Sequence, residues 1–237
     1  MKEAFDYRKW VKIFALAFVA LEVALFPIIQ LTLGDVSAYA SYSAIILVAV
    51  FALITVKGAR AGHLIRLGIL FTLVADYFLV LADDSELEGV IAFCAVQLCY
   101  FAYLLIKEKR RIVKITNAVS RALLSALLVI VAFLVLGEDT DPLAIVSVLY
   151  YGNLVANVVF AFLLGREERI FAIGLALFSM CDLCIGLEVL FDSYLDSSAF
   201  DFVYGSHLNL PWVFYQPSQA LIGLHLGTKI NVNTDGV

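Results

Sequence analysis

Two aspartates stand inside long apolar segments of this sequence. Asp76 lies in VADYFLV and Asp182 in SMCDLCI. A charged residue at the centre of a membrane-spanning helix costs roughly 3 kcal/mol on insertion scales, and such residues mark functional sites by default. A carboxylic acid beside a carboxylate can donate one proton and accept another. The two aspartates are therefore the best indication in this sequence of where the function lies, and the simpler alternative is that they hydrogen-bond between helices.

The composition places the chain in a membrane. Hydrophobic residues make up 63% of its 237 residues and the mean hydropathy is +0.97, whereas a soluble domain is about 45–50% apolar. The predicted class is an all-α polytopic membrane protein surrounded by membrane lipids. The net charge of −5 argues against nucleic acid as a partner. All four cysteines lie in apolar segments, so we expect free thiols.

Eight apolar runs are long enough to cross a bilayer core of about 30 Å, which needs roughly 20 helical residues. We predict eight transmembrane helices at Val11–Leu33, Ala38–Val56, Leu64–Ala82, Glu88–Ile106, Ile115–Leu136, Pro142–Leu164, Arg169–Phe191 and Leu208–Leu226. The connections are short except for Asp192–His207, which could cap the bundle from outside or, as its aromatic residues favour, lie flat at the membrane interface.

Basic residues gather on alternate connections. The N-terminal segment, the second, fourth and sixth connections and the tail hold every Lys and Arg except Arg121. The positive-inside rule therefore predicts that both termini are cytoplasmic and that the protein is integral to the cytoplasmic membrane. Arg121 lies about two turns into the fifth run, and we expect its side chain to reach back to the cytoplasmic surface.

The eight runs form a single domain, 1–237, that divides into halves 1–110 and 111–237. Asp76 falls on the third helix and Asp182 on the seventh, which is the equivalent place in the second half. A four-plus-four parallel repeat would bring the two carboxylates to similar depth about an axis along the membrane normal.

Polar residues recur at helical spacing on several runs and could line one cavity. They are Glu22 on the first, Thr72 on the third, Gln97 and Tyr100 on the fourth, Tyr150, Asn153 and Asn157 on the sixth, Glu188 on the seventh, and Trp212, Tyr215 or Gln216, and Gln219 on the eighth. Such residues can bind a substrate, or they can simply hydrogen-bond between helices for about 0.6 kcal/mol each. Glu188 could instead reach the outer interface.

Metal and cofactor chemistry finds little support. Cys181 and Cys184 flank Asp182, but the three histidines fall near the two membrane surfaces rather than beside them. We therefore read the cysteines as packing residues and predict no metal. The motifs of serine and zinc hydrolases and of phosphate-binding loops are missing from the sequence, and no cofactor is predicted.

Two short motifs resemble those of the YhhN family of lysoplasmalogenases. The first is ADYFL followed by GVIAFCAVQLCY, in which Asp76, Leu79, Gly89, Phe93 and Tyr100 match. The second is FSMCD followed by YQPSQ, in which Phe178, Asp182, Tyr215 and Gln219 match. The sequence departs from the family pattern at Ala75, Cys181 and Gln97, where the family usually has Gly, Ser and His. Gln97 can hydrogen-bond a substrate, but it cannot shuttle a proton at neutral pH.

The resemblance implies hydrolysis of the vinyl ether bond of lysoplasmalogen, giving a fatty aldehyde and a glycerophospho-alcohol. The partner would be a lysophospholipid or another ether lipid. Vinyl ether hydrolysis passes through an oxocarbenium ion, as glycoside hydrolysis does, and needs one carboxylic acid and one carboxylate. Asp76 and Asp182 would supply them in either order. Gln97, Tyr100, Tyr215 and Gln219 would orient the ether oxygen, the water or the glycerol hydroxyl.

Two other functions remain open. Carboxylates near the midplane are also the usual proton relays of transporters, so a proton-coupled transporter of small solutes or lipids is one alternative. The prolines within the runs, Pro27, Pro142, Pro211 and Pro217, do not adjoin either aspartate, which weakens it. The other alternative is a noncatalytic lipid-binding member of the same fold, which the exchange at Gln97 would permit.

Overall fold

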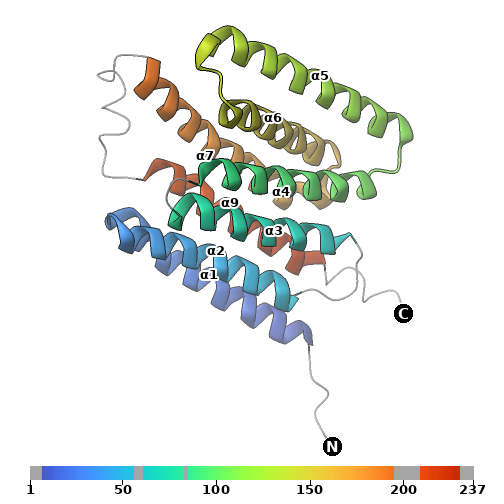
Figure 1. Ribbon diagram of the computed structural model, residues 1–237. Helices are drawn as coiled ribbons and strands as arrows, with labels where there is room; N and C mark the ends of the chain where they lie inside the picture. The colour runs from blue at the N-terminus through green and yellow to red at the C-terminus, as the bar shows by residue number, and fades with distance from the viewer. Residues whose placement is uncertain (1–6, 56–60, 83–84, 195–208, 230–237) are drawn as a thin grey trace, which may run out of the picture.

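The computed structural model is a bundle of long α-helices (Figure 1). The structure describes residues 7–55, 61–82, 85–194 and 209–229. Within them, the long helices are α1 (Tyr7–Leu31), α2 (Asp35–Thr55), α3 (Gly62–Asp76), α4 (Glu86–Lys107), α5 (Arg111–Leu136), α6 (Pro142–Leu163), α7 (Arg169–Tyr194) and α9 (Leu210–Lys229). Each corresponds to one predicted run, and the described residues contain no strand. The predicted all-α class is confirmed.

Seven of these eight helices, α1 to α7, are long and apolar enough to cross a membrane. The third reaches that length only because α3 continues into a π-helical turn, Tyr77–Leu81. The eighth, α9, falls short because it carries polar residues such as Gln216, Ser218 and Gln219, which are buried inside the bundle. A multi-pass membrane protein is confirmed, and the eighth crossing stays a prediction.

Several predicted features lie outside the described residues. They include the first six residues, part of the second connection (56–60), the tail after Lys229 and most of the long connection Asp192–His207. The cytoplasmic placement of both termini and the interfacial position of that connection therefore stay predictions.

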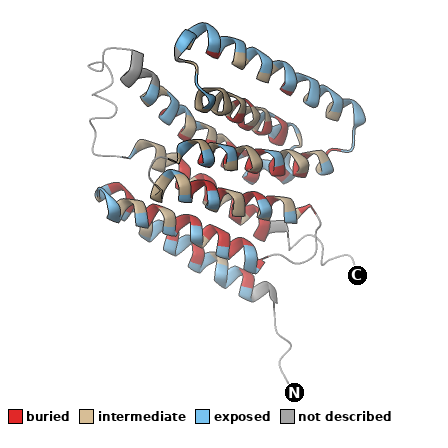
Figure 2. Cartoon of the chain, in the orientation of Figure 1, coloured by how far each residue is buried: buried red, intermediate tan, exposed pale blue. Residues whose placement is uncertain are grey.

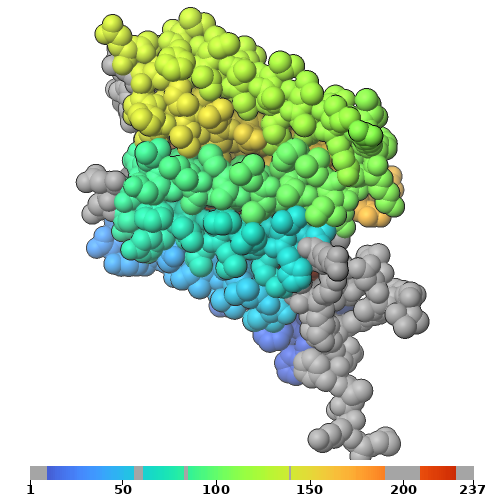
Figure 3. Space-filling model, turned by 45° about the vertical axis from the view of Figure 1, so that its right-hand side comes forward, coloured from blue at the N-terminus to red at the C-terminus, as the bar shows by residue number. Residues whose placement is uncertain are grey.

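Along each half, every helix packs on the next one. The halves join where α4 packs on α6 and where α9 packs on α2 and α1. The closest association is between α7 and α9. On the face shown in Figure 3, the cyan α3 lies beside the green α4, and the yellow atoms of α6 lie between α4 and the yellow-green α5. Helix α5 lies at one edge of the bundle, packed mainly on α6.

Helix limits follow from local sequence. Helix α6 begins with a proline at its first position, and the Asp141 carboxylate before it accepts a hydrogen bond from the Ala144 amide at 2.7 Å, which caps free N–H groups of the first turn. After α6 the chain reverses at Gly165, whose φ of 92° favours glycine. A 3-10 turn, Arg166–Glu168, follows, and α7 begins at Arg169.

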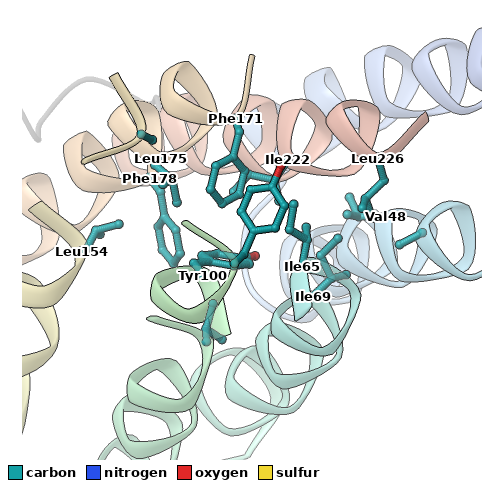
Figure 4. Packing of buried hydrophobic residues seen from close by; sticks show 14 of the residues in the cluster. Val48, Ile65, Ile69, Tyr100, Leu154, Phe171, Leu175, Phe178, Ile222 and Leu226 are labelled. Carbon is teal, nitrogen blue, oxygen red and sulfur yellow. The ribbon is translucent and has the colours of Figure 1, made fainter. Parts of the chain in front are cut away.

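Glycines allow two of the helix contacts to be close. A Cβ added at Gly89 of α4 would lie 2.5 Å from Leu79 Cγ and 3.2 Å from the Ala75 carbonyl oxygen. A Cβ at Gly174 of α7 would lie 3.1 Å from the Ser218 carbonyl oxygen of α9. Buried residues follow these contacts through the middle of the bundle (Figure 2). The core contains Tyr100, Phe171, Phe178 and Ile222 from α4, α7 and α9 (Figure 4).

Candidate active site

Asp76 is held by a tyrosine from the last helix. Its side chain is buried, and its Oδ2 accepts a hydrogen bond from the Tyr215 hydroxyl of α9 at 2.6 Å. Asp76 is also the last residue of α3 before the π-helical turn, a distortion that occurs often at functional sites. The contact of Gly89 with Leu79 and Ala75 supports this turn from α4.

Asp182 has a similar partner on another helix. The Tyr150 hydroxyl of α6 donates a hydrogen bond to Asp182 Oδ2 at 2.5 Å. Tyr150 is buried, while Asp182 is partly exposed. Each aspartate therefore accepts a hydrogen bond from one tyrosine, and hydrogen bonds to a charged group are the stronger kind.

One aromatic cluster joins the two aspartate–tyrosine pairs. It consists of Phe93, Tyr150, Phe178 and Tyr215. The Phe93 ring stacks on Tyr150 with centroids 5.5 Å apart and meets Tyr215 edge-on at 6.5 Å. Phe178 lies 5.3 Å from both Phe93 and Tyr215. The structure thus brings Asp76 and Asp182 to one site, although they are more than a hundred residues apart in the sequence.

Buried polar groups without hydrogen-bond partners lie one helical turn from this site. Among the described residues, Gln97 Nε2 and Gln219 Oε1 have no hydrogen-bond partner, and the hydroxyls of Thr72 and Tyr100 have no other partner than each other. Thr72 lies one turn from Asp76, Gln97 one turn from Phe93, and Gln219 one turn from Tyr215. Buried polar groups are nearly always paired in proteins, so unpaired ones need an explanation such as a water or a ligand.

A hydrogen-bond network of Arg121, Asn153, Asn157 and Gln97 extends this layer. Arg121 donates to Asn153 Oδ1 at 2.9 Å and to Asn157 Oδ1 at 2.8 Å. Asn157 Nδ2 in turn donates to Gln97 Oε1 at 2.9 Å. The expectation that Arg121 reaches back to the membrane surface is wrong. Its guanidinium turns into the bundle because amide oxygens of α6 and the ring of Phe101, 4.0 Å away, surround it there.

Two predicted residues lie apart from the aspartates. The Glu22 carboxylate of α1 accepts a hydrogen bond from Gln216 Nε2 at 2.8 Å, which joins α1 to α9. Gln216 follows Tyr215 in the sequence but serves this other contact. Glu188 is half-buried, six residues beyond Asp182 toward the end of α7, and interacts electrostatically with Cys184.

Sequence reasoning missed two features. Tyr150 belonged to the polar stripe of its helix, but nothing in the spacing identified it as the partner of Asp182. The second feature is a buried cluster in which the Tyr103 hydroxyl lies 2.6 Å from Glu168 Oε2 and 2.9 Å from His225 Nε2. His225 and Glu168 are 3.0 Å apart. The only signal for it was the place of Glu168 and His225 near the basic ends of their helices.

The residues that could bind a metal do not converge. The described residues contain no group of three or more His, Cys, Asp or Glu side chains with suitable geometry. All four cysteines are free thiols, as predicted, and Cys181 and Cys184 are buried. Cys181 packs in the same core as the aromatic cluster.

The fold and the site together define a polytopic helical membrane protein in which two tyrosine-bound aspartates share one site. Comparison with known proteins agrees with the resemblance of the motifs. The model of the YhhN family matches residues 36–225, and the chain belongs to that family. No curated protein and no solved structure gives a significant match.

Proposed function

We propose that this protein hydrolyses the vinyl ether bond of lysoplasmalogen-type lipids. The observation that carries the proposal is the arrangement of Asp76 and Asp182. Each carboxyl group accepts a hydrogen bond from a tyrosine, and the two tyrosines share one aromatic cluster inside the bundle. Family membership is compatible with a hydrolase, and this reaction requires one carboxylic acid and one carboxylate.

The reaction needs no group beyond these residues, water and the lipid. One aspartic acid protonates the β-carbon of the vinyl ether, which leaves an oxocarbenium ion stabilised by the other, ionised aspartate. Water then attacks the carbon next to the ether oxygen, and the ionised aspartate accepts its proton. When the hemiacetal collapses, the first aspartate takes back a proton from its hydroxyl group, and the second aspartate donates its proton to the departing ether oxygen. The C–O bond to that oxygen breaks, which releases the glycerophospho-alcohol and a fatty aldehyde. Each turnover consumes one water and returns both carboxyl groups to their starting states.

The aromatic cluster and the unpaired polar groups have distinct roles in this proposal. Phe93 and Phe178 pack against the two tyrosines that bind the aspartates, and aromatic rings there can stabilise a developing positive charge. Tyr150 and Tyr215 fix the orientation of the two carboxyl groups. Gln97, Tyr100 and Gln219 bind polar parts of the substrate or the attacking water, because their side chains have unused hydrogen-bonding capacity.

The surrounding topology belongs to the same proposal. Both termini are cytoplasmic, α9 is the eighth crossing, and the two halves are a parallel repeat. The corresponding contacts of α4 with α6 and of α9 with α2 support the repeat. Asp76 and Asp182 then occupy equivalent places in the third helix of each half, and the protein is a multi-pass protein of the cytoplasmic membrane.

The experiment is aldehyde release from a vinyl-ether lysophospholipid by the purified protein in detergent. We expect turnover in the wild type and a loss of at least about 100-fold in Asp76→Asn and in Asp182→Asn, which is the usual contribution of a general acid or base. Both variants must melt as the wild type does. A folded Asp→Asn variant with wild-type turnover would exclude the pair. Binding without turnover by a stable wild type would favour the noncatalytic lipid-binding alternative.

A further inference from the structure

Helix α5 carries a cation into the bundle that has no anionic partner there. Of its 26 residues, only Arg121 and Ala132 are buried, and most of the helix is exposed along the edge of the bundle (Figure 2). Within the described part of the chain, no carboxylate lies within ion-pair distance of Arg121. Its partners are neutral amide oxygens of Asn117, Asn153 and Asn157.

Neutral partners satisfy some of the N–H groups of the guanidinium, and the Phe101 ring lies 4.0 Å away, but among the described residues no anion balances its charge. A buried charge is costly, and in membrane helices such a residue usually marks a binding site or a pathway. The guanidinium also retains binding capacity. Its Nε is buried without an acceptor among the described residues, and the contact of Nη2 with Asn117 is long, at 3.5 Å. A planar fork of donors of this kind suits the oxygens of a phosphate.

Gln97 provides a second unused donor next to this cation. Asn157 accepts from Arg121 through its oxygen and donates to Gln97 Oε1 through its nitrogen. It therefore fixes the orientation of both side chains. The Gln97 Nε2 group is buried and unpaired within the described residues. The two N–H donors without acceptors thus belong to Gln97 of α4 and Arg121 of α5. The amide side chain of Asn157 hydrogen-bonds to both residues.

The depth of this group fits a lysophospholipid whose ether lies at the aspartates. Arg121 is ten residues from the first residue of α5, and Gln97 is ten residues from the last residue of α4. At 1.5 Å per residue, each lies about 15 Å from the basic end of its helix. Asp76 is fourteen residues from the first residue of α3, and Asp182 is thirteen residues from the first residue of α7. Both aspartates therefore lie about 20 Å from the basic ends of their helices. With the basic ends of these four helices taken as level, the offset along the bundle is about 4.5–6 Å.

The same offset occurs within the lipid. Six covalent bonds separate the vinyl carbon on the ether oxygen from the phosphorus of a glycerophospholipid. An extended chain advances about 3.3–3.6 Å for every three bonds, so six bonds reach at most about 7 Å. A phosphate at Arg121 and a vinyl ether at the aspartates can therefore belong to one molecule, whose headgroup faces the basic ends of the helices.

We propose that Arg121 and Gln97 bind the phosphate of the lysophospholipid, and that Asn157 orients them. This proposal rests on the proposed hydrolase function for the identity of the lipid, but not for the presence of an anion site. It assigns substrate selection to the phosphate: an alkenyl glycerol without phosphate is a poor substrate, although it contains the same reactive bond.

The test measures binding without turnover. The wild type is titrated with a saturated ether lysophosphoethanolamine, which cannot be hydrolysed by this route, and its melting temperature in detergent is recorded. Parallel titrations use the corresponding alkyl glycerol and inorganic phosphate. We expect saturable stabilisation by the lysophospholipid alone. Arg121→Gln should weaken its apparent Kd by roughly 10- to 100-fold, the value of a hydrogen-bonded charged group.

Two further variants keep the result interpretable. Arg121→Lys retains the charge but loses the planar fork, so it should bind with intermediate affinity and serves if Arg121→Gln does not fold. Gln30→Leu is the matched control, because Gln30 is a buried glutamine whose Nε2 donates to the Asn209 carbonyl oxygen, away from this network. It should bind as the wild type does.

Each alternative outcome has a definite meaning. Equal stabilisation by the alkyl glycerol, or wild-type affinity in folded Arg121 variants, would overturn the phosphate site. Stabilisation by inorganic phosphate alone would make this a site for a free anion and overturn the lipid assignment. Phosphate-dependent binding by a wild type that releases no aldehyde would refute the hydrolase and leave the phosphate site intact.

Discussion

Tyr150→Phe removes one oxygen atom from the candidate active site and leaves its packing in place. The ring of Tyr150 stacks on Phe93, and phenylalanine can keep that contact. What is lost is the 2.5 Å hydrogen bond to Asp182. A hydrogen bond to a charged group contributes about 1.5–3 kcal/mol, and each 1.36 kcal/mol on the barrier changes the rate about tenfold. We expect kcat to fall roughly 10- to 150-fold if the bond positions Asp182 for the reaction.

The assay is steady-state aldehyde release at saturating vinyl-ether lysophospholipid, with the melting temperature measured on the same preparation. The matched control is Tyr151→Phe. Tyr151 is the next residue of α6 and loses the same oxygen, but its hydroxyl accepts only a long 3.3 Å hydrogen bond from Ser179. We expect this control to keep wild-type kcat. Equal kcat in both variants would refute the idea that Tyr150 acts on the reaction through Asp182.

Three other predictions follow from the same contacts. Gly89→Val should destabilise the folded state by about 1–3 kcal/mol, as overpacking does, because the valine side chain would collide with Leu79. Thermal unfolding measures this loss, and an unchanged melting temperature would contradict the close contact. Gln97→His should keep or raise kcat, since a neutral imidazole offers one acceptor and one donor, and a large loss of kcat would contradict this. The Arg110 guanidinium hydrogen-bonds to Glu108 and lowers the pKa of that carboxyl to about 2. This contact therefore stabilises the folded state above the ordinary glutamate pKa and is lost as the pH falls through about 2, so the melting temperatures of wild type and Glu108→Gln should converge between pH 5 and 2.

Much of the fold was predictable because hydrophobic runs of membrane length have few alternatives to a helix. Helix α4 was predicted at Glu88–Ile106 and observed at Glu86–Lys107. The third run was harder, because its last turn is π-helical and the α-helix ends at Asp76. An apolar sequence such as YFLVL does not distinguish an α from a π turn. Gly89 of the next helix packs closely against this turn, and that tertiary contact cannot be found from the local sequence.

The candidate site was predictable as a set of residues but not as a set of pairs. Asp76 and Asp182 stood out because a carboxylate is costly in an apolar segment. Their partners, Tyr215 and Tyr150, come from helices that are distant in the sequence, and helical spacing cannot show which helices face each other. The prediction for the side chain of Arg121 was wrong for a related reason. Snorkelling assumes that the nearest polar surroundings are at the membrane surface, whereas here they are the amide side chains of α6.

Helix α4 connects the polar levels of the bundle. Phe93, Gln97, Tyr100 and Tyr103 follow one another at spacings of four, three and three residues, so they share one face. Phe93 contacts the aspartate-binding tyrosines, Gln97 belongs to the arginine network, and Tyr103 contacts Glu168 and His225. A shift of α4 along its axis would therefore disturb all three levels together. The close contacts of this helix with α3 resist such a shift, which gives its glycine and aromatic residues a role in the geometry of the site as well as in stability.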